Sequence, residues 1–412
     1  MNQPQPILAL DVGTTKVCAL IGADHGGEIH IVGLGLAPSP GMRQGVVVDL
    51  QETTRAIREA VSRAQQMAGL RPESAWVGVT GEHIACMNTR AAVAVSHQDH
   101  LITEETIARL HQAANHNAAL GPDRVLLHSV PRGYLVDGQR GVRRPEGMSA
   151  SKLEVETHLV TGSRNFIENV DKCVEAAGVS VQEFVFEPLA SARALLTPEE
   201  EDLGVAVLDI GGGTTDLAVF VSGSVCHTGA VPVAGNHITR DLAVGLQVSL
   251  EEAEQLKVQQ GCALVVDMDT DDLIEIGTIG TDEKRELPRR VLAEIIEPRV
   301  QEIFQLVRRE IDRSGFGGHI ASGVVLTGGG SQLPSIQPLA RATLGCTVRL
   351  GQVSNVGGVT TAVRSPIYAT SVGLLRYAAE HARGRPEPAP GLGRLSAWWD
   401  WLTRRIGRFF RG

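Results

Sequence analysis

One short motif occurs twice in this chain, and the two copies are separated by almost half of its 412 residues. The first copy is Asp-Val-Gly-Thr-Thr-Lys at 11–16, and the second is Asp-Ile-Gly-Gly-Gly-Thr-Thr-Asp at 209–216. Each copy lies between two apolar runs, a pattern that predicts a β-hairpin with a polar turn. The separation is far longer than any solenoid period, so the repeat predicts two similar domains and not a repeat array.

Both turns have the chemistry of a phosphate site. Bound phosphate needs converging backbone N–H groups and a neutralising cation, and glycine turns allow the close approach. Lys16 could reach a terminal phosphate, and Asp11 and Asp209, at the ends of their strands, could hold Mg²⁺ through its waters. A third glycine loop, Thr327–Ser331, also follows an apolar run. A single glycine turn after a strand is usually structural, but three such loops favour a functional role.

Two common nucleotide motifs are missing from the sequence. The chain has no G-x-x-x-x-G-K-[ST] loop, which excludes a Walker A site. It also has no G-x-G-x-x-G opening a helix, so a dinucleotide-binding fold is not supported.

Hydrophobic spacing predicts an α/β organisation in the first half, interrupted by an insert. We expect strands at 7–10, 17–22, 29–36, 45–48 and 75–80 and a helix at 50–68 closed by Gly69. From 82 to 161 the pattern changes, which indicates an inserted subdomain. In and after this insert we expect helices at 107–117 and 163–177 and strands at 125–130, 134–136, 153–160 and 185–186.

The second half shows the same alternation. We expect helices at 237–245, 249–258 and 289–313, a strand at 323–326, partial helix at 361–382, and a loop-rich stretch at 267–290. Residues 383–393 (RGRPEPAPGLG) are expected to form a linker that does not pack.

Charge, cysteine spacing and apolar run lengths indicate a cytosolic protein and exclude several other classes of protein. The net charge of −9 argues against a nucleic-acid binder. Six widely spaced cysteines without a C-x-x-C pair indicate reduced thiols in a cytosolic protein. No run of apolar residues is long enough to span a membrane, and the amino terminus lacks the basic region of a signal peptide.

The carboxy-terminal tail has the opposite character to this acidic body. Three of the four tryptophans, at 398, 399 and 401, lie there, together with five arginines after residue 391. On a helical wheel the large apolar side chains other than Trp401 fall within about 120°, and most of the arginines lie opposite or beside them. Such a helix lies in the interface of an anionic membrane. A helix docked on its own domain or on a protein partner is the alternative. The expected membrane-contacting residues are Leu395, Trp398, Trp399, Leu402, Arg404, Arg405, Ile406, Arg408, Phe409 and Phe410.

These motifs, in this order, resemble the actin, Hsp70 and sugar-kinase ATPase superfamily. L-A-L-D-V-G-T-T-K is similar to its phosphate-1 motif, V-L-D-I-G-G-G-T-T-D to phosphate-2, and V-V-L-T-G-G-G-S to its adenosine motif. The segments 186–192 and 371–375 resemble the two connecting segments. The resemblance implies two RNase H-like halves around a nucleotide cleft that holds ATP and Mg²⁺.

The resemblance also implies a role for individual residues. Asp11 and Asp209 would organise Mg²⁺ through water, and Glu187 would orient water in members that hydrolyse ATP; a structural Glu-Pro turn is the alternative for Glu187. Binding is indicated more clearly than hydrolysis, because no catalytic base stands out. The implied ATP-binding residues are Gly13, Thr14, Thr15, Lys16, Gly212, Gly213, Thr214, Glu254, Lys257, Gly328, Gly329 and Gly330.

Within the superfamily, the insert and the tail resemble the FtsA family of cell division proteins. The implied architecture is an actin-like ATPase fold with an inserted subdomain, called 1C in that family, and a C-terminal amphipathic helix. The implied division is 1–82 (1A), 83–161 (1C), 162–197 (1A), 198–228 (2A), 229–300 (2B), 301–360 (2A), 361–382 (1A), a linker at 383–393 and the helix at 394–412.

Family resemblance further implies a function at the cytoplasmic face of the inner membrane, at the division site. Such a protein would polymerise, tether the tubulin-like FtsZ ring through its subdomain 2B, with Arg299 as a candidate contact, and recruit later divisome proteins through 1C. Two alternatives share the fold. A metabolic kinase would need a polar substrate pocket, and a PilM-like pilus scaffold normally lacks such a tail.

Overall fold

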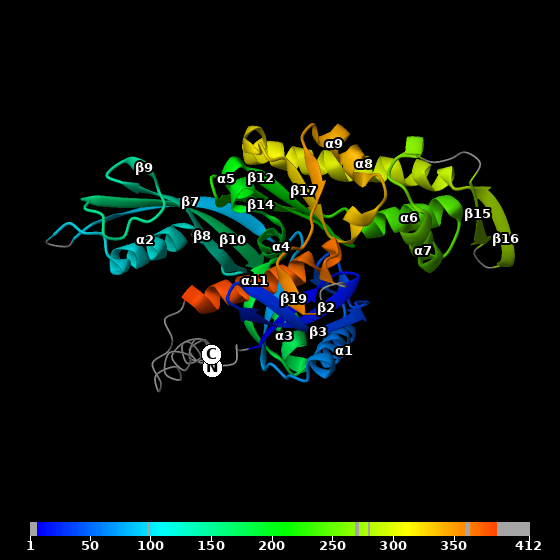
Figure 1. Cartoon of the computed structure of the whole chain (residues 1–412), viewed down its shortest axis with the longest axis horizontal. Helices are drawn as coiled ribbons and strands as arrows, with labels where there is room; N and C mark the ends of the chain where they lie inside the picture. The colour runs from blue at the N-terminus through cyan, green and yellow to red at the C-terminus, as the bar shows by residue number, and fades with distance from the viewer. Residues whose placement is uncertain (1–5, 97–98, 268–271, 279–280, 359–362, 385–412) are drawn as a thin grey trace.

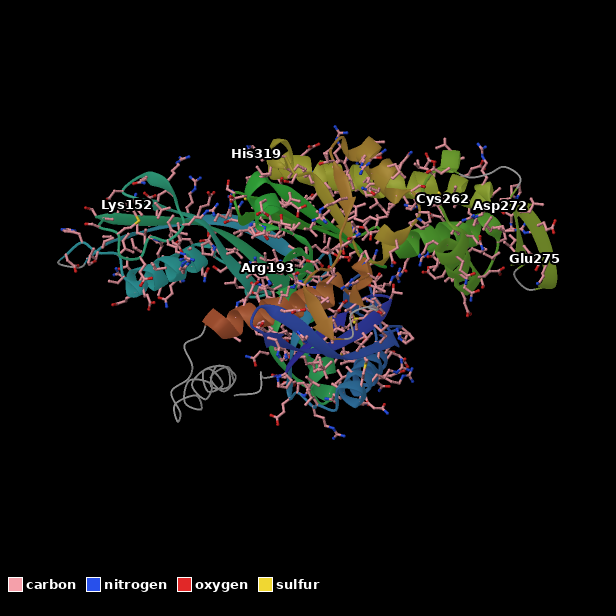
Figure 2. All side chains as sticks on the ribbon, in the orientation of Figure 1. Lys152, Arg193, Cys262, Asp272, Glu275 and His319 are labelled. Atoms are coloured by element: carbon pink, nitrogen blue, oxygen red, sulfur yellow. The ribbon has the colours of Figure 1, made fainter. Side chains whose placement is uncertain are left out.

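The computed structural model describes residues 6–96, 99–267, 272–278, 281–358 and 363–384. Two mixed β-sheets form the centre of the molecule, one from each half of the chain (Figure 1). The inserted subdomain extends from one end, and a small helical lobe with a β-hairpin extends from the other. The labelled side chains of Figure 2 mark these ends: Lys152 lies on the insert, and Asp272 and Glu275 lie on the small lobe.

The first sheet has six strands in the order β11-β6-β1-β2-β3-β19. The β1–β2 and β2–β3 pairs are antiparallel. On the other side of β1, β6 runs parallel to β1 and β11 runs parallel to β6. Its strands are β1 (Ile7–Val12), β2 (Lys16–His25), β3 (Glu28–Pro38), β6 (Ser74–Val79), β11 (Ser180–Phe186) and β19 (Val356–Gly358), with a two-stranded ribbon of β4 (Met42–Arg43) and β5 (Val46–Val47) beside it.

Helices cover both faces of this sheet. One face packs against α1 (Leu50–Ala68) and α3 (Arg164–Ala176), and the other against α4 (Glu187–Leu195) and α11 (Ala369–Gly384). The bounds of α1 are those expected from its spacing: Asp49 caps its first turn by accepting from the N–H groups of Gln51 and Glu52, and Gly69 ends it at φ 66°.

The inserted subdomain is a four-stranded sheet, in the order β7-β10-β8-β9, with one helix. Its elements are β7 (Ala85–Ala94), α2 (Glu104–Asn117), β8 (Arg124–Val136), β9 (Gln139–Val142) and β10 (Lys152–Ser163). The expectation of separate strands at 125–130 and 134–136 was wrong, because one strand runs through Pro131 and Gly133. Its pairing with β10 shifts register between Glu156 and Thr157, which accommodates the proline.

The second sheet repeats the hairpin of the first, with the order β14-β13-β12-β17-β18. Its strands are β12 (Val205–Ile210), β13 (Thr215–Val221), β14 (Ser224–Val231), β17 (Val324–Thr327) and β18 (Val348–Leu350). One face packs against α8 (Arg290–Ser314) and α9 (Ile336–Leu344). The other face packs on α4, so the two halves share one apolar core; a short helix, α5 (Pro198–Leu203), joins the halves.

The small lobe consists of α6 (Gly235–Leu246), α7 (Leu250–Gln260), the 3₁₀ turn η1 (Val265–Asp267) and two strands. The expectation that 267–290 is loop-rich was wrong: β15 (Leu273–Thr278) and β16 (Thr281–Pro288) form an antiparallel hairpin. The alternation of Ile274, Glu275 and Ile276 is the signal for it, and the face that carries Ile274 and Ile276 packs on the lobe.

The chain returns to the first half through short 3₁₀ turns. These are η2 (Gly317–His319), η3 (Gly329–Gln332) and η4 (Pro366–Tyr368), the last of which leads into α11. Arg383 and Gly384, expected to begin the linker, are the last two residues of α11. The remaining linker and the tail helix, 385–412, lie outside the described residues. None of the described helices is both long and apolar enough to cross a membrane.

Candidate functional site

The two copies of the motif form equivalent turns. In the first, the N–H of Gly13 donates to the carbonyl of Lys16 at 3.1 Å; in the second, the N–H of Gly211 donates to the carbonyl of Thr214 at 3.0 Å. The strand pairings also match, because Asp11 pairs with Cys18 and Asp209 with Asp216. The sequence repeat is therefore a structural repeat, with each aspartate near the end of the central strand of its sheet.

The tips of the two turns face each other, and glycine makes this possible. A Cβ atom at Gly212 would overlap the hydroxyl of Thr15. At Gly213 it would lie 2.5 Å from the hydroxyl of Thr14 and 2.9 Å from Cα of Gln44. The Thr14 hydroxyl also accepts from the N–H of Gly45 at 3.1 Å. Backbone N–H groups and threonine hydroxyls from the two halves thus lie together where the two turns meet.

The second turn is held by the start of α6. The N–H of Gly235 donates to Gly211 O at 3.1 Å, and the N–H of Asn236 donates to Gly212 O at 2.8 Å. This helix also carries Thr239, whose hydroxyl bonds the carboxylate of Glu254.

Glu254 and Lys257, on α7, lie beside that helix start. Lys257 Nζ is 2.5 Å from Glu254 Oε2 and donates to the carbonyl of Gly235 at 3.3 Å. The predicted ribose- and base-contacting pair is therefore next to the second turn.

The third glycine loop packs on the end of β12. Gly328 has φ +81°, and a Cβ atom there would overlap Oδ1 of Asp209 and lie 2.5 Å from the carbonyl oxygen of Ile210. A Cβ atom at Gly330 would overlap the Ile210 side chain, whereas Gly329 faces more open space. The third loop therefore meets the second at Asp209.

Asp11 and Asp209 are buried behind the two turns. Asp209 Oδ2 accepts from the hydroxyls of Ser191, at 2.9 Å, and Thr370, at 3.1 Å. Asp11 Oδ2 accepts from Ser371 at 3.4 Å. Burial raises the pKa of both carboxyls, and these hydrogen bonds oppose the rise. Two connecting helices, α4 and α11, thus position the two aspartates.

Lys16 is the cation of the site. Its Nζ lies 3.9 Å from Asp11 Oδ2, donates to the carbonyl of Ile367 at 3.0 Å and sits over the Tyr368 ring. Burial lowers the pKa of Lys16, but the negative charge of Asp11 and its neighbours outweighs burial and holds the pKa above its usual value. The ammonium group therefore stays charged.

Glu187 and Asp216 add two further buried carboxyls. Burial, reinforced by Asp11 and the other carboxylates, raises the pKa of Glu187 well above its usual value. Burial raises the pKa of Asp216 to about 7, although the Thr214 hydroxyl donates to it at 2.8 Å. Glu187 Oε1 and Asp216 Oδ1 are buried without a hydrogen-bond partner among the described residues. A buried oxygen without a hydrogen-bond partner lowers the free energy of unfolding unless a ligand, an ion or water bonds to it.

Sequence reasoning missed four residues of this cluster. Asp216 was quoted as the end of the second motif but was not assigned to the site. Ser191, Thr370 and Ser371 follow no local pattern; only their place on the two connecting helices brings them to the aspartates. Within the described residues, no group of three or more His, Cys, Asp or Glu side chains is arranged to hold a metal ion directly.

Arg299 lies away from the cleft, on α8. It forms a two-pronged pair with Asp241 of α6, with Nε–Oδ2 2.5 Å and Nη2–Oδ1 3.0 Å, and also bonds Glu302. The guanidinium group joins α8 to the small lobe. The ten predicted membrane-contacting residues of 395–410 lie outside the described residues.

Comparison with known proteins identifies the family. The family model "Cell division protein FtsA" matches residues 206–373, and "SHS2 domain inserted in FTSA" matches 81–161. The cell division protein FtsA of Pseudomonas aeruginosa is 41% identical, over 95% of this chain and 97% of its own. That of Escherichia coli K12 is 36% identical over 92% of each, and that of Bacillus subtilis is 36% identical over 93% of this chain and 86% of its own.

Solved structures show the same fold at low identity. A PilM-PilN type IV pilus biogenesis complex chain aligns with TM-score 0.64 and 17% identity, over 90% of this chain and 98% of its own. MreB5 of Spiroplasma citri bound to ADP aligns with TM-score 0.56 and 13% identity, over 92% and 97%. The fold is the actin-like ATPase fold with an inserted SHS2 domain, and the chain belongs to the FtsA family of cell division proteins.

Proposed function

We propose that this chain binds ATP and Mg²⁺ between its two halves and works in division as an actin-like filament protein. The observation that carries the proposal is the pair of equivalent turns, facing each other with an aspartate behind each. Gly13, Thr14, Thr15 and Lys16 would hold the phosphates from one side, and Gly212, Gly213 and Thr214 from the other. Glu254, Lys257 and the loop of Gly328, Gly329 and Gly330 would hold the nucleoside.

The donor set around the cleft fits a hydrated magnesium ion. Asp11, Asp209, Glu187 and Asp216 supply only oxygen atoms, which is the ligand type Mg²⁺ prefers, and Mg²⁺ usually keeps several of its waters. The unpartnered oxygens of Glu187 and Asp216 could accept from those waters. When bound, the ion would neutralise phosphate charge and stabilise the ionised carboxylates.

Glu187 is proposed to orient water at the terminal phosphate. Burial and the neighbouring carboxylates raise the pKa of Glu187 well above its usual value, which disfavours the ionised form that a base needs until positive charge enters the site. Nucleotide binding is therefore the primary proposal, and hydrolysis is measured separately with Glu187→Gln.

Calorimetric titration of ATP with Mg²⁺ tests the site. Gly212→Val places a branched side chain against Thr15, so we expect its affinity for ATP to fall at least about tenfold, which corresponds to about 1.4 kcal/mol. Gly318→Val is the matched control, because a Cβ at Gly318 meets nothing within 4 Å and its φ is not positive. No heat with the wild-type chain, or equal affinity in Gly212→Val, would contradict the proposal.

The tail is proposed as the membrane anchor. One cationic amphipathic helix gives weak, reversible binding, and polymerisation would place many anchors on one surface, so avidity would make attachment stable. The sequence of 394–412 and the family support this proposal. It places the protein on the cytoplasmic face of the inner membrane, as a peripheral protein at the division site.

Co-sedimentation with anionic vesicles tests the anchor, using the intact chain and one that ends at Gly393. We expect the intact chain to bind, more strongly with ATP than without, and the shortened chain to stay in the supernatant. Neutral vesicles are the control for charge. Equal binding of the two chains would refute the anchor and would favour the PilM-like alternative.

Two partner surfaces are proposed on the same grounds. The FtsZ ring would be tethered through the carboxy-terminal peptide of FtsZ on 229–300, and later divisome proteins would be recruited through the inserted subdomain, 83–161. Arg299 already joins α6 to α8, so we propose that it shapes this surface as well as offering a contact. Titration of the FtsZ peptide into the wild-type chain and into Arg299→Ala measures the contribution of Arg299 to binding. No binding to the wild-type chain would refute the docking site.

A metabolic kinase of the same fold remains the rival function. It would transfer phosphate from ATP to a small acceptor at a substantial rate. Incubation with ATP and a panel of small hydroxylated acceptors separates the two functions, and efficient transfer would overturn the cytoskeletal proposal.

A further inference from the structure

The inserted subdomain is fastened to the second sheet by polar contacts on β14. Cys86 Sγ, on β7, donates to the carbonyl of Thr228 at 3.1 Å, and Asn88 Nδ2 donates to the carbonyl of Cys226 at 3.3 Å. From β10, His158 Nε2 lies 3.2 Å from the hydroxyl of Thr228. We call these three contacts the insert junction; they join β7 and β10 of the insert to β14 of the second sheet.

A cysteine, a histidine and a glutamate are aligned at this junction. Cys86 Sγ lies 3.7 Å from Nδ1 of His227, and His227 Nε2 lies 3.1 Å from Oε1 of Glu310 on α8. Gly229 makes room for the glutamate: a Cβ atom there would lie 3.3 Å from Glu310 Oε1 and 3.5 Å from His227 Nε2. The carboxylate accepts from Nε2, so Nδ1 faces the sulfur. This is the order of groups that activates a thiol nucleophile.

The surrounding charges favour transfer of the thiol proton to the imidazole. Burial raises the pKa of Cys86, but its contacts with His227 and Thr228 outweigh burial and hold the pKa below its usual value. Contacts with Cys86 and Glu310 raise the pKa of His227 against the effect of burial. Arg313 lies 3.7 Å from Glu310, and the other basic groups nearby, Arg132 and His158, lie on strands of the insert.

The remaining cysteines provide an internal reference. Burial raises the pKa of Cys18, Cys173, Cys226 and Cys346. Of these, only Cys346 is partly exposed, as Cys86 is. Cys86 has the His227 ring 3.7 Å from its sulfur, whereas the charged group that opposes the effect of burial at Cys346 is Arg308.

We propose that Cys86 is a site of oxidation by hydrogen peroxide. His227 protonates the departing hydroxide, and Glu310 holds the His227 ring in position. The Cys86 thiolate attacks one peroxide oxygen, so that an S–O bond forms and the O–O bond breaks. The departing hydroxide takes the Nδ1 proton of His227 and leaves as water. Sulfur is oxidised by two electrons to a sulfenic acid, and peroxide is reduced to water. The Nε2 proton stays on His227 and is donated to the Glu310 carboxylate throughout.

Oxidation changes the insert junction directly. The thiol donates to Thr228 O at 3.1 Å, and no space for another oxygen atom is left between them. In the sulfenic acid the S–H that makes this contact is gone and an oxygen is bonded to the sulfur, so we expect β7 to loosen from β14. The inference does not depend on ATP or membrane binding.

Peptide mapping with a sulfenic-acid probe tests the proposal in the full-length protein. After a pulse of hydrogen peroxide at pH 7, we expect Cys86 to be labelled at least about tenfold faster than Cys346. His227→Asn removes the proton acceptor and should lower the Cys86 rate to that of Cys346, while Glu310→Gln should lower it several-fold. Cys346 in each variant reports whether the fold is intact, because its own rate should not change.

A pH profile separates activation from simple exposure. The midpoint for alkylation of Cys86 by iodoacetamide should lie below that of Cys346 in the wild-type chain, and it should rise in His227→Asn. Hydrogen exchange on β7 and β14 should become faster after oxidation of the wild-type chain but not of Cys86→Ser. Equal rates or midpoints for Cys86 and Cys346 in the wild-type chain overturn the proposal without any variant.

Discussion

Lys16 and Asp216 carry opposite charges and stand at different places in the two hairpins, since Asp216 pairs with Asp209 where Cys18 pairs with Asp11. Each follows the Thr-Thr pair of its turn. Lys16 stays charged because Asp11 lies beside it, whereas Asp216 is buried among acidic neighbours and its pKa rises to about 7. The duplication thus supplies a cation on one side of the cleft and a titratable carboxyl on the other.

Asp216 makes the stability of the nucleotide-free protein depend on pH. Its pKa is about 7 when folded, against 3.8 for the free carboxyl, so the folded state binds more protons and stability falls as pH rises between these values. The substitution Asp216→Asn removes the carboxyl and with it this loss of stability at high pH. We expect the variant to be more stable than the wild-type chain at pH 8, by up to about 4 kcal/mol at 1.4 kcal/mol per pKa unit.

Urea unfolding at pH 5, 6, 7 and 8 checks this expectation. The slope of the free energy of unfolding against pH should be shallower in Asp216→Asn, and the variant and wild-type values should approach each other near pH 4. Asp11, Asp209 and Glu187 shift in the same direction and keep part of the slope. Identical slopes would show that Asp216 is ionised throughout.

At the scale of elements, α1 lies directly on two glycines of β3. A Cβ atom at Gly35 would overlap the carbonyl oxygen of Ala60, and one at Gly33 would overlap that of Ala64. Glycine here sets the distance between helix and sheet, and hence the position of the strands that carry Asp11 and Lys16.

We therefore expect Gly35→Ala to be strongly destabilising. Overpacking against helix backbone should cost about 3 kcal/mol or more of the free energy of unfolding. Gly69→Ala, at the end of the same helix, meets nothing within 4 Å and should cost about 1 kcal/mol for its positive φ. Denaturant unfolding of the two variants measures both, and a smaller cost at Gly35 than at Gly69 would contradict the packing argument.

The ion pair between α6 and α8 is a second test at this scale. Arg299 holds Asp241 with two hydrogen bonds, and both side chains are about a quarter to a third exposed. A double-mutant cycle with Arg299→Ala and Asp241→Ala should give a coupling energy of about 1 kcal/mol. Arg290 and Glu294, exposed on one face of α8, are the comparison pair and should couple by less than about 0.5 kcal/mol. Equal coupling in both pairs would mean that the lobe is not held by Arg299.

Some elements could be predicted from sequence and others could not. The helix at 50–68 has both a capping aspartate and a terminal glycine, so its pattern is complete locally. Strand β7 gave no signal, because most of its residues are exposed and it is held by pairing with β10. Likewise Asp11 and Asp209 can be recognised from their motif, whereas Ser191 and Thr370 reach Asp209 only through the packing of α4 and α11.

At the scale of the whole molecule, one apolar core joins the two halves. It includes Leu20 of the first sheet, Val207 and Val325 of the second, and side chains of α4 and α11. Because these residues exclude water together, the halves should lose their structure together.

A chain ending at Gly393 makes this measurable, since Trp76, on β6 of the first half, is then its one tryptophan. We expect its fluorescence and the far-ultraviolet circular dichroism to give the same unfolding midpoint. Val325→Ala, in the second half, should shift the Trp76 midpoint as much as the dichroism midpoint. Two separate midpoints would mean that the halves unfold independently.

One helix connects the base of the cleft to the far end of the chain. Thr370 and Ser371, at the start of α11, hold Asp209 and Asp11, and the helix ends at Gly384. Sixteen residues make a rigid rod about 24 Å long. Because this rod packs on α4 and the first sheet, it moves with Asp11 as one rigid body, so a rotation of the first half relative to Asp209 also reorients the end of α11 at Gly384.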